Sequence, residues 1–419
     1  MLEALKIRDF RFLWSGRAVS QLGSWLLVIA IPAHVLALTG SLLATGLTMV
    51  AEYLPPLVVG PIAGVLTDRW DRRRVMLSAD AFRAVAVALM LFGTTAQSVW
   101  LIYAALIAES LGTVLFRPAA QANTPAIVGT GSALSSAVSL NGFTDGVVRL
   151  VGPPLGAALL TLTNFQTLIL IDTASYLVSA VAILMTSRRP AVQREPGSTA
   201  LGVFEDMVAG LRVLRGVPIA LMLLPLTTVF LTANAGLSAI LVPFGVRQLG
   251  GSEQIGLVVS ALGIGFLIGA VLIRRLVDRV QPRYLLAAVQ LATAAAFFML
   301  FTSTSLVVAL PAAVLIGTFG SMTLVTPQTA LQRVVPNEVL GRISSVFFAA
   351  EALATLIGAL VGPLLASSFS IYTTMVIAVI VTALGALVGL PLVPVLPELL
   401  PKKQPADTQP TGSNVTGTE

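Results

Sequence analysis

Apolar runs long enough to cross a bilayer as helices alternate with short polar segments along almost the whole chain. The runs stay apolar over about 20 residues or more instead of alternating every second residue, so they predict helices and not β-strands. Twelve such runs lie at residues 11–38, 43–66, 75–96, 98–122, 135–162, 165–186, 217–247, 254–276, 284–303, 306–330, 343–367 and 371–395. The pattern therefore predicts an all-α membrane protein with twelve transmembrane helices.

A single long polar segment divides these runs into two equal groups. Residues 187–216 interrupt the apolar pattern, and six runs lie on each side of them. We expect a central loop here, joining two six-helix halves at residues 1–186 and 217–395. The last residues, 396–419, are rich in Pro, Thr, Gly and Lys, which predicts a disordered tail.

The two halves also resemble each other in sequence. Shifting the chain by 209 or 210 residues brings positions of the first half onto the same residue types in the second. The matches are Leu66 with Leu276, Asp68-Arg69 with Asp278-Arg279, Pro118 with Pro327, Ser135-Ser136 with Ser344-Ser345, and Gly152-Pro153 with Gly362-Pro363. Ordered matches at nearly one offset indicate two homologous six-helix pseudo-repeats, an arrangement that membrane transporters use.

Composition agrees with a protein that lies mostly in the bilayer. The 419 residues are 56% hydrophobic and 11% charged, with mean hydropathy +0.93, whereas soluble proteins carry about 25% charged residues. Cysteine is absent and His34 is the only histidine, which excludes disulfides, thiol catalysis and Cys/His metal sites. The phosphate-binding pattern Gly-x-x-x-x-Gly-Lys-Ser/Thr is absent as well. We therefore expect no cofactor, no enzymatic activity, and an ion gradient as the energy source.

The positions of the basic residues predict the topology. The formal charge is +6, and 21 of the 25 Lys and Arg residues fall at the termini or in alternate loops. Cytoplasmic loops collect basic residues, so both termini, the central loop and the tail are expected in the cytoplasm. The basic excess is thus a feature of topology, and we expect no nucleic-acid partner.

Residues 64–74 form a short polar turn between the second and third runs, Gly-Val-Leu-Thr-Asp-Arg-Trp-Asp-Arg-Arg-Arg. This turn resembles motif A of the major facilitator superfamily, Gly-x-Leu-x-Asp-Arg-x-Gly-Arg-Arg, with Asp71 in place of the second Gly. The matching residues are Gly64, Leu66, Asp68, Arg69, Arg72 and Arg73. The resemblance implies a conformational latch between the halves on the cytoplasmic side, with Arg117 as a partner. The alternative is that these arginines only anchor the turn at lipid headgroups.

A second motif lies in the fifth run, at residues 149–156, Arg-Leu-Val-Gly-Pro-Pro-Leu-Gly. It resembles the Gly-Pro motif of proton-coupled drug exporters in the same superfamily. Gly152 and Gly156 are four residues apart and predict a face for close helix packing, with a kink at Pro153. The eleventh run repeats the pattern at Gly362-Pro363, so the alternative is that part of the signal reflects the repeat and not export.

Charged residues inside the runs are candidates for function, because a charge in the bilayer needs a partner or a water-filled cavity. Asp145 and Arg149 are four residues apart and predict an ion pair on one helix face, either structural or switched by a proton or the substrate. Glu52, Glu109 and Glu351 are the other candidates for binding a proton or a cationic substrate.

Further polar residues inside the runs have ordinary structural interpretations. Asp80 and Arg83 are three residues apart and predict a structural pair. Gln21 and Asn234 could orient a substrate, although hydrogen bonds between helices are the usual reason for such residues. The role of Asp172 stays open.

The resemblance covers residues 5–395, and Phe116-Arg117-Pro118-Ala119 looks like the branch of macrolide, other drug and siderophore exporters. It implies a secondary active transporter in the bacterial inner membrane that exports small amphipathic or cationic compounds by proton antiport and alternating access. The expected partners are a small-molecule substrate, protons and the lipid bilayer, with the protein as a monomer. The alternative is a siderophore or other metabolite exporter of the same superfamily. A membrane enzyme or a sensor is disfavoured, because catalytic motifs and a sizeable soluble region are absent.

Overall fold

The computed structural model describes residues 3–129, 131–187, 212, 214, 216–277, 279–335 and 337–393, apart from some side chains inside the helices. All regular structure in these residues is helical. Twelve of the helical segments are long and apolar enough to cross a membrane, which confirms the predicted fold class. Most of the predicted central loop and all of the predicted tail lie outside the described residues, so the domain limits stay a prediction.

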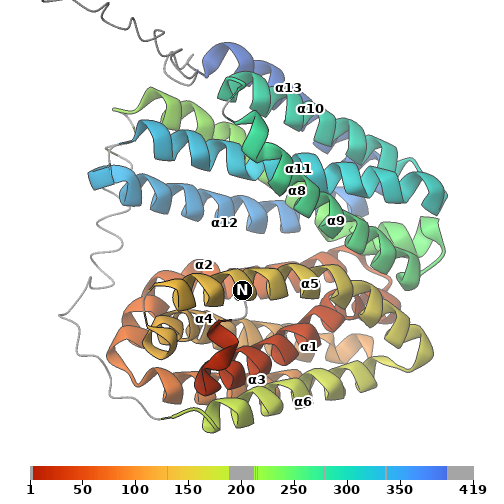
Figure 1. Cartoon of the computed structure of the whole chain (residues 1–419). Coiled ribbons are helices and arrows are strands. Elements are labelled where there is room, and N and C mark those ends of the chain that lie inside the picture. The colour runs from red at the N-terminus through yellow and green to blue at the C-terminus, as the bar shows by residue number, and fades with distance from the viewer. Residues whose placement is uncertain are drawn as a thin grey trace, which may run out of the picture.

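The helices of each half follow one another through short turns, so neighbours along the chain run in opposite directions (Figure 1). In the first half they are α1 (Arg8–Thr39), α2 (Leu42–Arg69), α3 (Arg72–Leu89), α4 (Val99–Val128), α5 (Ser132–Leu162) and α6 (Phe165–Leu184). In the second half they are α8 (Pro218–Phe244), α9 (Ser252–Leu276), α10 (Pro282–Phe301), α11 (Leu306–Val334), α12 (Asn337–Ser368) and α13 (Ile371–Leu392). We call the end where α6 finishes and α8 starts the linker side, and the opposite end the far side.

Polar side chains at the turns fix where several helices begin. The Ser41 hydroxyl accepts from the Ala44 amide at 3.2 Å at the start of α2, and Asn164 caps α6 in the same way at 2.8 Å. Asp71 accepts from the Arg74 amide at 2.9 Å and caps α3. A capping carboxylate satisfies a helix N–H group that has no partner within the helix. The residue that departs from motif A is therefore the N-cap of the next helix.

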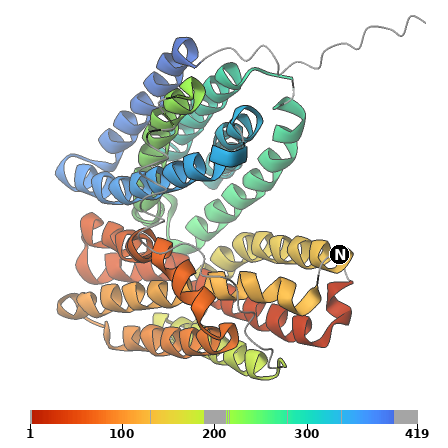
Figure 2. The same ribbon diagram turned by 90° about the vertical axis from the view of Figure 1, so that its left-hand side faces the viewer.

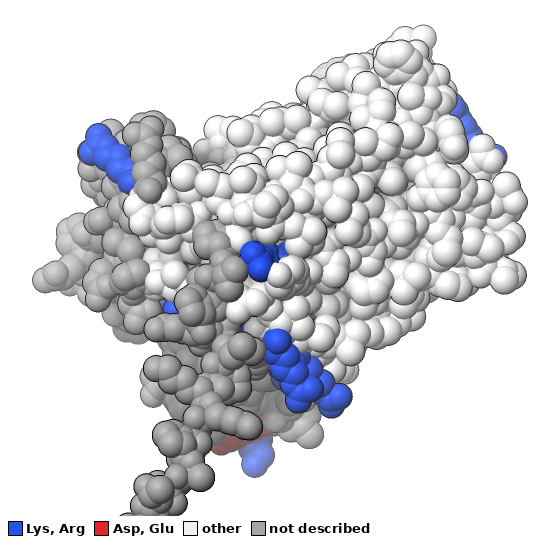
Figure 3. All heavy atoms as spheres, turned by 90° about the horizontal axis from the view of Figure 1, so that it is seen from above, with Lys and Arg blue, Asp and Glu red and all other residues white. Residues whose placement is uncertain are grey.

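The two halves lie side by side, and their contact runs through two pairs of helices. Figure 2 looks onto the linker side, with α1–α6 in one bundle and α8–α13 in the other. Helix α5 packs on α9, and α2 packs on α12. The outer face of the second half is almost free of charge along most of its length, with most basic groups toward the linker side and a smaller basic patch at the far side (Figure 3). An uncharged outer face is what contact with lipid requires.

Glycine and proline form the contact between the halves, and they do so twice. A Cβ atom added to Gly46 of α2 would lie 2.7 Å from Cβ of Pro363 on α12. One added to Gly256 of α9 would lie 2.9 Å from Cα of Pro154 and 3.3 Å from the Pro153 carbonyl on α5. Gly46 and Gly256, like Pro153 and Pro363, are separated by 210 residues. We call these two places the far-side contact, and the repeat of the sequence thus reappears as a repeat of the packing.

Other contacts between the halves strengthen the far side, whereas two glycines nearer the linker side, Gly60 and Gly142, have free space. One apolar core joins Ile29 and Leu36 of α1 to residues of the second half. The Arg247 guanidinium donates to the Gly40 carbonyl across the halves at 3.5 Å. By contrast, a Cβ atom added to Gly60 of α2 or Gly142 of α5 would meet nothing within 4 Å. The described packing between the halves is therefore tightest at the far side.

Alanine substitutions test this difference. Gly60→Ala and Gly142→Ala should keep or raise the thermal unfolding midpoint in detergent, because alanine favours a helix interior by about 1 kcal/mol over glycine and has room there. Gly46→Ala and Gly256→Ala should lower the midpoint, because their methyl groups meet a proline ring or backbone. Equal midpoints for all four variants would contradict a tight far-side contact.

Candidate functional site

A cavity of about 360 Å³ lies between the two halves. The first half contributes Trp25 of α1, Tyr53 of α2 and Arg149 of α5 to its lining, and each of these lies near the middle of its helix. The rest of the lining comes from α8, α9, α10 and α11. Since the helices span the bilayer, the cavity lies near the midplane of the membrane, where transporters of this build bind their substrates.

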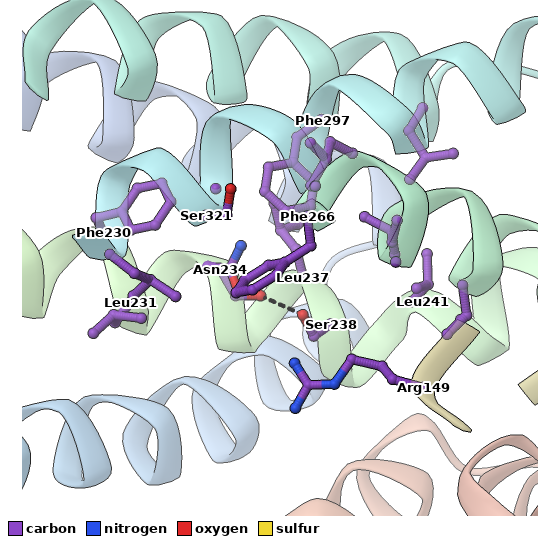
Figure 4. Close-up of a pocket in the computed structure, with 18 of the residues that line it drawn as sticks. Arg149, Phe230, Leu231, Asn234, Leu237, Ser238, Leu241, Phe266, Phe297 and Ser321 are labelled. Carbon is purple, nitrogen blue, oxygen red and sulfur yellow. Dashed lines mark hydrogen bonds between the residues drawn. The ribbon is translucent and has the colours of Figure 1, made fainter. Parts of the chain in front are cut away.

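Aromatic and aliphatic side chains make up most of this lining. The aromatic residues are Trp25, Tyr53, Phe230, Phe266 and Phe297. Figure 4 shows Asn234 and Ser238 on α8 close to Arg149, with Ser321 deeper in the second half. The Ser238 hydroxyl donates to the Asn234 carbonyl at 2.8 Å, and the Ser321 hydroxyl donates to Thr318 of its own helix at 3.0 Å. An apolar pocket with a few polar groups is suited to holding an amphipathic small molecule.

Arg149 is the only charged residue in the described lining. Its guanidinium carbon lies 5.2 Å from the centre of the Trp25 ring and 5.8 Å from that of Phe266. A cation at this distance from an aromatic ring is attracted by the ring electrons. Trp25 belongs to the first half and Phe266 to the second, so Arg149 is held between rings of both halves.

The predicted ion pair between Asp145 and Arg149 is wrong. Asp145 instead pairs with Arg17 of α1 at 3.2 Å and accepts a hydrogen bond from Gln21 at 2.9 Å. Helix α1 packs along α5 and brings these two donors to the carboxylate, while the rings of Trp25 and Phe266 attract the guanidinium of Arg149. Spacing along one helix could not reveal the partners that a second helix supplies.

Glu109 of α4 lies within the first half and is not in the cavity lining. Its carboxylate accepts from the Tyr176 hydroxyl of α6 at 2.7 Å and from Thr113 at 2.8 Å. The Tyr176 oxygen also lies 2.9 Å from the hydroxyl of Ser24 on α1. A chain of hydroxyl groups therefore runs from α1 through Tyr176 to Glu109.

Beside Glu109 lies the pair that sequence spacing predicts, Asp80 with Arg83, and the structure confirms it as an ion pair. The Arg83 guanidinium carbon also lies 4.3 Å from the centre of the Phe116 ring and 4.4 Å from that of Tyr176. Asp172 is 1% exposed and accepts from the Ser175 hydroxyl at 3.0 Å. We call Asp80, Arg83, Glu109, Asp172 and Tyr176 the buried polar cluster.

The remaining two predicted carboxylates lie on α2 and α12, which pack against each other across the two halves. Glu52 of α2 is exposed, directly precedes Tyr53 of the cavity lining, and lies within electrostatic range of Glu109 and Arg117. Glu351 of α12 is half-buried and has no side-chain hydrogen bond within the described part of the chain. Of the five predicted coupling and substrate residues, only Arg149 lines the cavity.

Two arginines of motif A, Arg72 and Arg73, donate to backbone carbonyls of helices in their own half. Arg72 donates to the Ala122 carbonyl of α4 at 2.9 Å. Arg73 donates to the carbonyls of Ile183 and Leu184 at 3.1 and 2.6 Å, at the C-terminal end of α6 where the helix dipole attracts cations. The side chains of Asp68 and Arg69, and the surroundings of Gly64, lie outside the described part. A latch across the halves therefore stays a prediction.

The glycines of the fifth and eleventh runs lie at close approaches between helices. Gly152 faces Trp25 of α1, and Gly156 faces the backbone of Leu26. Gly362 of α12 meets the backbone of Gly236 on α8 in the corresponding way. Because the following prolines, Pro153 and Pro363, face the other half, each Gly-Pro step packs within its half and between the halves at once.

Comparison with known proteins gives relatives that are membrane transporters. The chain matches the family described as transmembrane secretion effector over residues 2–411. It is similar to macrolide efflux protein A of Streptococcus pyogenes, with 28% identity over 208 residues, 49% of this chain and 51% of the relative. It is also similar to the uncharacterized MFS-type transporter YfiS of Bacillus subtilis, with 26% identity over 253 residues, 60% of this chain and 57% of the relative. The chain spans about half the length of these relatives.

Solved structures with the same fold cover nearly the whole chain. A bacterial homologue of the iron transporter ferroportin, in an inward-facing state, has TM-score 0.73 and 16% identity over 92% of this chain and 98% of that one. A D-xylose–proton symporter has TM-score 0.67 and 16% identity over 94% and 98%. At this level of identity the similarity establishes the fold alone.

A double-mutant cycle tests which arginine Asp145 contacts. Arg17→Gln and Asp145→Asn should show a coupling free energy of about 0.5–1 kcal/mol in unfolding by SDS titration, because the paired side chains are 27% and 46% exposed and water screens them. Arg149→Gln combined with Asp145→Asn should be additive. Coupling to Arg149 and none to Arg17 would contradict the observed pairing.

Proposed function

This chain belongs to the transmembrane secretion effector family of the major facilitator superfamily, and we propose that it exports small amphipathic compounds by proton antiport. The family and the relatives are membrane transporters and not enzymes, and the twelve helices make the chain a multi-pass membrane protein. The observation that carries the proposal is the apolar cavity between two six-helix halves at mid-membrane.

The direction of opening follows from topology and packing together. Basic residues gather on the linker side, so we place this side in the cytoplasm of a bacterial cell, at the inner membrane. The far-side contact then separates the cavity from the outside. Gly60 and Gly142, which have free space around them, lie between the cavity and the cytoplasm. This conformation would admit a substrate from the cytoplasm, as an exporter requires before its halves rock to the other state.

Export is favoured over uptake by two observations. The residues around Gly152-Pro153 resemble the Gly-Pro motif of proton-coupled exporters, and macrolide efflux protein A is a relative. The apolar lining supports an amphipathic substrate, whereas the described lining holds no carboxylate for a cationic one. Export of a siderophore or another metabolite is the alternative, because such compounds would use the same cavity.

For the coupling proton we propose Glu109 together with Glu52. Glu52 is exposed beside the cavity residue Tyr53, and Glu109 lies within electrostatic range of it. Glu109 is linked to α1 through Tyr176 and Ser24, so a change in its charge would be felt by a helix that lines the cavity. Asp145 is a weaker candidate, because Arg17 and Gln21 already compensate its charge.

Transport in proteoliposomes tests this function. With tritiated erythromycin as a cationic probe, 1-anilinonaphthalene-8-sulfonate as an anionic one and a pH-sensitive dye, the unaltered chain should move at least one of these compounds under a proton gradient and release protons when that compound is added. Glu109→Gln cannot lose a proton, so it should abolish gradient-driven accumulation while drug exchange across the membrane continues.

The control is Glu253→Gln, an exposed carboxylate at the start of α9 far from the cluster, which should leave gradient-driven accumulation unchanged. Gradient-driven transport that persists in both Glu109→Gln and Glu52→Gln would overturn the coupling proposal. Failure of the unaltered chain to move erythromycin or other amphipathic drugs would favour the siderophore or metabolite alternative.

A further inference from the structure

We propose that the transported compound is an amphipathic organic anion, which places a carboxylate or similar group on Arg149 and its apolar body against the aromatic walls of the cavity. This inference rests on the proposed function and narrows its substrate class. It starts from the charge balance of the arginines inside the membrane-spanning helices.

Arg149 differs from Arg17 and Arg83 in having no ion pair within the described residues. Arg117 of α4 has no ion pair either, but it lies within electrostatic range of Glu52. Arg17 pairs with Asp145, and Arg83 pairs with Asp80. Within the described residues, the guanidinium of Arg149 has neither an ion pair nor a hydrogen bond, and its side chain is exposed to the cavity. A charge at mid-membrane is costly without a partner, so the occupied cavity is where its counter-charge is expected.

The geometry leaves the donors of Arg149 available to a ligand. The aromatic rings of Trp25 and Phe266 lie 5.2 and 5.8 Å from the guanidinium carbon. Rings attract a cation without accepting strong hydrogen bonds at its N–H groups. A planar guanidinium can then form two parallel hydrogen bonds with one carboxylate, which lysine cannot do in the same way.

The other polar groups in the described lining favour a ligand that accepts hydrogen bonds over a cationic ligand. The side-chain amide of Asn234 and the hydroxyl of Tyr53 can both donate, and no Asp or Glu lines the cavity. Asp145, which lies four residues before Arg149, is held by Arg17, and Glu52, which precedes the lining residue Tyr53, lies within electrostatic range of Arg117. A cationic compound would therefore meet a like charge at Arg149 without a carboxylate to offset it.

Two fluorescent probes with the same ring system test the inference by binding alone. 1-Anilinonaphthalene-8-sulfonate carries an anion, and N-phenyl-1-naphthylamine lacks it. In phosphatidylcholine nanodiscs, with empty nanodiscs as background, the unaltered chain should bind the anion at least about tenfold more tightly than the neutral probe. A tenfold preference corresponds to about 1.4 kcal/mol, which is close to the lower end of what a hydrogen bond to a charged group contributes.

Substitutions then locate this preference. Arg149→Gln should remove the preference for the anion and leave binding of the neutral probe within about twofold. Arg149→Lys should keep part of it, because the charge remains. Arg283→Gln is the matched control, an arginine on the linker side of α10 whose guanidinium contacts Tyr284, and it should keep the full preference.

Several results would overturn the inference. Equal binding of the two probes by the unaltered chain would do so, as would an anion preference that survives Arg149→Gln. A cation site would be indicated instead if tetraphenylphosphonium displaced the neutral probe at a lower concentration than 1-anilinonaphthalene-8-sulfonate does. The comparison of the two probes and the displacement by tetraphenylphosphonium both use the unaltered chain, so they decide the question even if Arg149→Gln fails to fold.

Failure of the inference and failure of the proposed function are distinguishable. Anion binding that depends on Arg149, without transport in proteoliposomes, would leave the site standing and refute the exporter. Gradient-driven erythromycin transport in a chain without any anion preference would leave the exporter standing and refute the anion site.

Discussion

The architecture depends on how closely backbone can approach backbone where the two halves meet. Gly46 against Pro363 and Gly256 against Pro153, Pro154 and Ala157 place helices of opposite halves in contact with only a proline ring or a methyl group between them. Small residues permit such approaches in membranes, where dispersion and not the hydrophobic effect holds helices together. Because both contacts lie at the far side, the cavity is covered on that side, and opening it there requires these contacts to separate.

The second constraint is charge. Inside the helices, Asp145 and Asp80 each have an arginine, and Glu109 is held by the hydroxyls of Tyr176 and Thr113. These groups are compensated within the first half, which can move as a body without breaking them. Among the described residues, Arg149 is compensated only by the rings of Trp25 and Phe266, one from each half. It is therefore the charged group most directly exposed to both the substrate and the relative position of the halves.

The helices, their number and the duplication follow from the sequence, because bilayer thickness fixes the length of an apolar run and few patterns satisfy it. The structural pair of Asp80 and Arg83 was also predictable, since both lie on one helix. The partners of Asp145 were not, because they come from α1. The equivalence of Gly46 and Gly256 could have been found by searching the sequence for pairs of glycines separated by 210 residues. Trp25, Tyr53 and Phe266 carried no such signal, since aromatic residues are scattered over many helix faces.

The central claim is that the halves close the two sides of the cavity alternately, so that the far-side contact is formed in one state and broken in the other. The chain has no cysteine, so spin labels can be placed at introduced cysteines without other changes. One pair, Arg74 and Gln332, reports on the linker side, and another, Thr94 and Thr304, reports on the far side; all four are exposed. When substrate and pH are varied in electron–electron double resonance, the linker-side distance should shorten as the far-side distance lengthens. Distances that change in the same sense, or only within one pair, would contradict the claim.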